Sequence, residues 1–99
     1  MKIDMTKSDN VLTFILAGSI DSATAPDLER ELKKNMDGVE KLYFDFSDVS
    51  FISSAGIRVI LWAYKVLPSE VRKVTIKNAG KEIREVFELT GITRLLILE

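Results

Sequence analysis

The chain has 99 residues, the length of one domain, so we expect residues 1–99 to form a single domain. Hydrophobic residues make up 46% and charged residues 29% of the sequence, a composition typical of globular proteins that excludes general disorder. The formal net charge of −1, from 14 basic and 15 acidic residues, argues against direct nucleic-acid binding.

The sequence contains neither cysteine nor histidine. Their absence excludes disulfides, thiol nucleophiles, zinc–thiolate sites and Ser-His-Asp triads, although carboxylate chemistry stays open. The N-terminus lacks the apolar run of a signal peptide, and no apolar stretch is long enough to span a bilayer. We therefore expect a cytoplasmic protein without membrane insertion.

A β-hairpin is predicted at the start of the chain. The apolar run 11–17 (VLTFILA) is typical of a strand that ends at Gly18. Residues 3–5 can pair with it across the polar turn 8–10.

The first helix is predicted to begin near Thr24, a residue type that caps helices well. Leu28, Leu32 and Met36 then recur every four residues and mark one buried face. The Asp-Gly pair at residues 37–38 favours the end of this helix.

The middle of the chain predicts a strand, a loop and a second helix. Residues 41–46 alternate as a strand, and the polar residues 47–50 read as a loop. The segment 51–57 opens a helix that extends to about Leu67, and Pro68 marks its end.

The last third predicts a strand at residues 71–77, a helix at 81–89 and a final strand at 95–98. The final strand is an unbroken apolar run, which is typical of burial on both faces. The order β-β-α-β-α-β-α-β predicts an α/β fold in which parallel strands extend the opening hairpin into a mixed sheet. We expect the helices to cover one face of that sheet.

Two adjacent serines stand at the start of the second predicted helix, in the segment 45–61 (DFSDVSFISSAGIRVIL). In a structural interpretation, Ser53 or Ser54 caps the helix and Gly56 permits close packing. In a functional interpretation, a serine hydroxyl is exposed at the positive helix end and can carry a phosphoryl group. That group would add a charge of about −1.5 to −2 to one patch and disturb a partner surface built for the hydroxyl.

The segment 45–61 resembles the signature of the STAS-domain family, specifically of its small bacterial anti-sigma factor antagonists. Two weaker likenesses flank it. Residues 18–21 (GSID) resemble the family's turn before the first helix, and residues 87–92 (FELTGI) resemble the segment before the last strand. The resemblance extends over nearly the whole chain and implies a single STAS domain.

The resemblance implies a regulator of transcription without catalytic residues, metal or cofactor. Such a protein binds an anti-sigma factor that is also a serine kinase, which releases the sigma factor. The kinase phosphorylates the antagonist and breaks the complex, and a metal-dependent serine phosphatase resets it. We expect the free protein to be a monomer.

The resemblance also implies which residues carry the switch. The phosphoryl acceptor is Ser54. Ser53 is the second choice, because it stands where family members often have an aspartate and so places a second hydroxyl beside the first. The loop around Asp21 shares the surface that binds the partner. The expected partner-binding residues are Asp21, Ser22, Ser53, Ser54, Ala55, Gly56, Ile57 and Arg58.

Other residues keep two interpretations. Asp21 can belong to the switch or be a turn aspartate that caps the first helix. Asp45 and Asp48 can bind Mg²⁺ or be solvated carboxylates, and Trp62 can anchor an interface or pack at the edge of the core.

The alternative function keeps the fold. In it, the chain is a constitutive STAS adaptor subunit of a membrane-associated lipid-transport complex and is not phosphorylated.

Overall fold

The computed structural model describes residues 1–70 and 72–99. Its elements are β1 (Lys2–Ser8), β2 (Val11–Ile20), α1 (Ala25–Asn35), β3 (Lys41–Ile52), α2 (Ser54–Val66), β4 (Lys73–Lys77), α3 (Lys81–Thr90) and β5 (Ile97–Leu98). The order of strands and helices is the predicted one. A short 3₁₀ helix, η1 (Ile92–Arg94), is added before the last strand.

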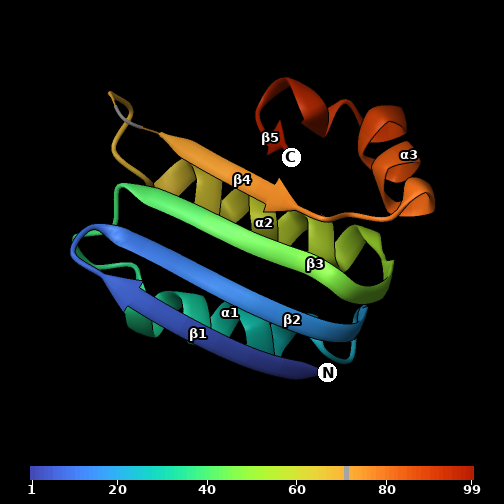
Figure 1. Cartoon of the computed structure of the whole chain (residues 1–99), viewed down its shortest axis with the longest axis horizontal. Helices are drawn as coiled ribbons and strands as arrows, with labels where there is room; N and C mark the ends of the chain where they lie inside the picture. Colours follow the sequence, from blue (N-terminus) through green and yellow to red (C-terminus); the bar gives the residue numbers. More distant parts are fainter. Residues whose placement is uncertain (71) are drawn as a thin grey trace.

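The five strands form one mixed sheet in the order β1-β2-β3-β4-β5 (Figure 1). β1 pairs antiparallel with β2, and the other neighbours pair in parallel. Figure 1 shows α1 and α2 together behind the sheet. α3 packs beyond the end of β4, where its Phe87 ring lies 6.1 Å from the Phe46 ring. The predicted α/β fold with a mixed sheet is confirmed.

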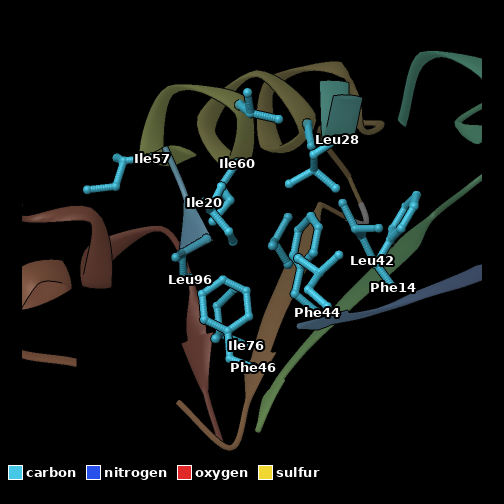
Figure 2. Packing of buried hydrophobic residues seen from close by; sticks show 14 of the residues in the cluster. Phe14, Ile20, Leu28, Leu42, Phe44, Phe46, Ile57, Ile60, Ile76 and Leu96 are labelled. Atoms are coloured by element: carbon cyan, nitrogen blue, oxygen red, sulfur yellow. The ribbon is translucent and has the colours of Figure 1, made fainter. Parts of the chain in front are cut away.

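The core lies between the sheet and the helices (Figure 2). Phe14, Phe44 and Phe46 line the sheet, with ring centroids 5.8 Å and 6.3 Å apart in successive pairs. Leu28 from α1 and Ile60 from α2 are fully buried against this layer. The burial of Leu28 follows the four-residue spacing that predicted the inner face of the first helix.

Both central strands are longer than predicted. β2 continues through Gly18 to Ile20, and β3 continues through residues 47–50 to Ile52. The predictions that Gly18 ends a strand, that residues 47–50 form a loop and that a helix opens at residue 51 are therefore wrong. Gly18 adopts φ +100°, and the pairing of β2 with β3 shifts register on either side of it. Glycine accepts this conformation without strain, so the strand bulges instead of ending.

Thr24 precedes α1 but does not cap it with its side chain, which corrects the predicted role. Its hydroxyl donates a hydrogen bond to the carbonyl of Ser19 (2.8 Å) and accepts one from the N–H of Asp21 (2.9 Å). The Thr24 side chain thus closes the turn between β2 and α1.

The C-terminal strand is an edge strand. Leu95 is 40% exposed and Ile97 is 43% exposed. The prediction of a strand over residues 95–98 that is buried on both faces is wrong: β5 comprises Ile97–Leu98, and Ile97 is exposed because α1 and α2 cover the same face of the sheet and leave the other open. Val71, the first residue of the preceding predicted strand, lies outside the described residues.

The longest described helix, α2, has 13 residues and ends before Pro68, as predicted. Between residues 1 and 70 and between 72 and 99, the structure contains no helix of the length and apolar character needed to cross a membrane.

Gly56 lies in the first turn of α2, against the ends of β2 and β3. A Cβ atom at this position would lie 2.7 Å from Cγ2 of Ile20 and 2.8 Å from Cγ1 of Ile52. Both isoleucines are buried, so neither can move aside easily. Glycine is required here because the helix approaches the strand ends more closely than a side chain would allow.

We expect Gly56→Ala to lower the free energy of unfolding by about 1–3 kcal/mol, the usual effect of overpacking a core. This is the net loss, because the steric clash outweighs the gain of roughly 1 kcal/mol that alanine has over glycine in helix propensity. Urea unfolding measures it. Gly80→Ser is the control, because a Cβ at Gly80 would meet nothing within 4 Å and serine caps helices well. Unchanged stability of Gly56→Ala would contradict the packing described here.

Candidate functional site

The candidate site lies where β2 and β3 end and where α1 and α2 begin. The N–H of Ser53 donates a hydrogen bond to the carbonyl of Ile20 (2.8 Å), so the start of α2 is tied to the end of β2. Ser22, from the turn that follows β2, lines the same groove as Ala55 and Arg58 of α2. The structure thereby brings together the two segments that the resemblance singled out.

Ser53 and Ser54 lie in different environments. Ser53 has an extended backbone, and its Oγ accepts a hydrogen bond from the N–H of Ala55 (3.2 Å), so Ser53 is the cap of α2. Ser54 is the first residue of the helix and is exposed. In the described part of the chain its hydroxyl has no hydrogen-bond partner. The hydroxyl of Ser54 therefore stands at the positive end of the helix without a structural task.

Asp21 organises the turn between β2 and α1. Its carboxylate accepts hydrogen bonds from the N–H groups of Ala23 (2.9 Å) and Thr24 (3.1 Å). These N–H groups, that of Thr24 foremost, hold the pKa of Asp21 below its ordinary value, because they stabilise the charged form. The turn interpretation of Asp21 thus has a direct structural basis. The side chain also remains partly exposed beside the site.

Gly56 and Ile57 were expected on the partner-binding surface, and both are buried. Gly56 packs on Ile20 and Ile52, and Ile57 is only 8% exposed. Their side-chain positions therefore face the core rather than a partner. Six of the expected residues remain at least partly exposed, and these are Asp21, Ser22, Ser53, Ser54, Ala55 and Arg58.

Phe51, close to the site in sequence, is an exposed aromatic residue that the sequence did not single out. Its side chain is 53% exposed at the end of β3, whereas the adjacent Ile52 is buried. The sequence predicted Phe51 in the opening of the second helix. Extending the strand to Ile52 would have placed these neighbours on opposite faces.

Trp62 is half-buried on α2 and lines the groove that begins at Ala55. The ammonium group of Lys33, from α1, lies 5.6 Å from the centroid of the Trp62 ring. The ring thus bridges two helices and presents part of its surface outward, which fits both interpretations of Trp62.

Asp45 already has hydrogen-bond partners. Its carboxylate accepts from the N–H of Ser47 (2.9 Å) and from Nδ2 of Asn78 (3.3 Å). These bonds, with nearby Lys77, hold the pKa of Asp45 below its ordinary value. Asp48 is exposed. Outside residue 71, no three acidic side chains gather into a group that could hold a metal ion.

Comparisons with known proteins agree in sequence and in structure. The family model described as the STAS domain matches residues 2–99. The chain is 37% identical over 92 residues to BtrV, a candidate anti-sigma factor antagonist of Bordetella bronchiseptica, and the match covers 92% of this chain and 79% of BtrV. A solved anti-sigma factor antagonist from Mycobacterium paratuberculosis has a TM-score of 0.86 and 28% identity, covering 98% of this chain and 83% of that chain.

The fold is also shared with the anti-sigma factor antagonist SpoIIAA. Its unphosphorylated form has a TM-score of 0.86 at 16% identity, covering 99% of this chain and 88% of that chain. Its phosphorylated form, from Bacillus, has a TM-score of 0.76 at the same 16% identity, covering 99% and 91%.

The two serines should differ in stability experiments. We expect Ser53→Ala to lower the free energy of unfolding by about 1 kcal/mol, because it removes the cap of α2. Ser54→Ala should stay within about 0.5 kcal/mol of the wild type, as is usual for an exposed residue without contacts. Thermal unfolding of the two variants, each the control of the other, measures this. A larger loss for Ser54→Ala would reverse the assignment of the cap.

The contribution of Asp21 should depend on pH. The pKa of Asp21 is lower in the folded chain than its ordinary 3.8, so the ionised carboxylate stabilises the fold above that value. The contribution is lost as the pH falls through the lowered, folded-state pKa. We expect the difference in unfolding free energy between the wild type and Asp21→Ala to be largest near neutrality and to shrink below a pH of about 4. Urea unfolding across this range checks it, and a constant difference would refute the role of the carboxylate charge.

Proposed function

The chain belongs to the STAS domain family, and from this premise we propose that it is an anti-sigma factor antagonist inactivated by phosphorylation of Ser54. BtrV and the Mycobacterium paratuberculosis protein carry the name of anti-sigma factor antagonist. In this role the chain is a regulatory binding protein rather than an enzyme. It binds an anti-sigma factor with serine kinase activity and thereby frees the sigma factor.

The observation that carries the proposal is that Ser53 and Ser54 differ in their hydrogen bonds. Ser53 caps α2, and the exposed Ser54 hydroxyl has no hydrogen bond within the described residues. A hydroxyl without a structural task can be modified without unfolding the helix that bears it. SpoIIAA, which shares this fold, has been solved in both a phosphorylated and an unphosphorylated form.

Phosphorylation would change the charge of the site at low cost to the fold. The Ser54 oxygen attacks the γ-phosphorus of ATP, the bond to ADP breaks, and the hydroxyl proton passes to a base of the kinase. The new group carries a charge of about −1.5 to −2. The positive end of α2 favours that charge, so the phosphorylated chain stays folded. Hydrolysis by a metal-dependent phosphatase returns the hydroxyl and releases inorganic phosphate.

The same charge would disfavour the partner. We propose that the exposed residues of the Asp21 turn and of the first turn of α2 dock the anti-sigma factor while Ser54 is unmodified. A partner surface shaped for the hydroxyl then meets a bulky dianion. Repulsion between like charges at an interface costs several kcal/mol, which is sufficient to break a complex.

We expect Ser54→Asp to weaken binding to the anti-sigma factor at least about tenfold, because it places a negative charge inside the interface. Ser54→Ala should bind as the wild type does. The measurement is calorimetric titration against purified anti-sigma factors of the cell in which the chain is native. Ser69→Asp is the matched control, since it adds the same charge to an exposed serine beyond the other end of α2.

A second measurement locates the acceptor. The chain is incubated with ATP and the anti-sigma factor that binds it, and fragment masses assign any phosphoryl group. A group on Ser53 would keep the switch and correct the site. Unchanged binding by Ser54→Asp, together with no phosphorylation, would overturn the switch and favour a constitutive adaptor.

A further inference from the structure

A groove runs between α1 and α2 and begins at Ser22 and Ala55, beside the paired serines. It has a volume of about 300 Å³ and is lined mostly by apolar groups, among them Pro26 from α1 and Val59 and Trp62 from α2. This volume is at the lower limit of pockets that hold small molecules. The groove is open to solvent, so its size and shape suit one large side chain of another protein.

One contact between the helices and one ion pair within α1 lie at the groove. Lys33 lies over the ring of Trp62 and also forms an ion pair with Glu29 (2.9 Å). Glu29, which lines the groove, is thus already neutralised from its own helix. The acidic wall therefore has no need of a cation from a partner.

Arg58 on the opposite wall has no such counter-charge. It is exposed, and within residues 1–70 and 72–99 it takes part in no ion pair or hydrogen bond. Its guanidinium group presents several donors in a plane, a geometry that matches a carboxylate. A partner that complements this groove would therefore present an apolar side chain to its lining and one carboxylate to Arg58.

The groove is continuous with the site of the proposed switch. Ala55 follows Ser54 directly and lines the groove, and Arg58 lies one helical turn after Ser54. A partner that covers Ser54 therefore reaches the groove without leaving the surface of α2.

We propose that this groove is the anchoring half of the docking surface. It receives one apolar side chain of the anti-sigma factor, and an adjacent carboxylate of that protein pairs with Arg58. The inference rests on the proposed function and adds the chemistry of the partner. Trp62 and Arg58 are also of residue types, tryptophan and arginine, that are enriched among the residues that dominate binding energy at interfaces.

The proposal gives phosphorylation a second route of action. Side chains four residues apart on a helix are neighbours, so a phosphoryl group on Ser54 can pair with Arg58. Arg58 would then no longer be available to pair with the partner's carboxylate. The modification would both repel the partner and remove its counter-charge.

The experiment titrates groove variants against the anti-sigma factor identified with the wild-type chain. Trp62→Ala should weaken binding about 30-fold, the loss expected of a residue that dominates an interface. Arg58→Glu should weaken it about tenfold or more, because attraction becomes repulsion. Tyr64→Ala and Lys41→Glu are the controls, the first an aromatic truncation on α2 outside the groove and the second the same charge reversal at the other end of β3. Both should bind as the wild type does.

Arg58→Glu is the decisive variant if Trp62→Ala fails to fold, because Arg58 is exposed and makes no structural contact of the kinds described. If Ser54→Asp loses binding and the groove variants bind as the wild type does, the docking role of the groove is refuted and the switch at Ser54 is supported. Loss by the groove variants alone would support the groove and overturn the switch. If no anti-sigma factor binds the wild-type chain, both proposals fall.

Discussion

The close contact between Gly56 and the two isoleucines beneath it, Ile20 and Ile52, fixes the geometry on which the site depends. It brings the first turn of α2 onto the ends of β2 and β3. The same contact buries Ile57 and turns Ser54 and Arg58 outward. Because the strands are held by the sheet and the helix is held by the strands, Ser54 and Arg58 stand on a rigid element rather than on a loop.

The hydrogen bonds that stabilise the site do not involve the atom that is proposed to carry the phosphoryl group. The helix end is completed by Ser53, whose oxygen accepts the N–H of Ala55, and the preceding turn is completed by Asp21 and Thr24. None of these bonds involves the hydroxyl of Ser54. A group added to Ser54 therefore breaks none of these hydrogen bonds. Its effect would be on the binding of a partner at this surface.

The sequence predicted the order of the elements well, because apolar spacing and turn residues are local signals. The two serines were found in the same way, whereas the Asp21 turn was placed at the site by the resemblance to the STAS-domain family. The extension of β3 through residues 47–50 was missed, since three of those four residues are polar and it is pairing with β2 that makes them a strand. The burial of Ile57 and the groove beside Trp62 depend on how α2 sits against the sheet and α1, which no local pattern encodes. The exposure of Ile97 likewise depends on which face of the sheet the helices cover.

The bonds around Asp21 also limit which conditions the surface can sense. Histidine, the one side chain whose ordinary pKa lies between about 5 and 8, is absent from the chain. The Asp21 turn moves the pKa of its carboxylate still further from neutrality. Changes in cellular pH near neutrality therefore leave the charge of the Asp21 carboxylate unchanged. If Ser54 is phosphorylated, the charge of this surface comes to depend on pH near neutrality, because the second pKa of a phosphoryl group is about 6.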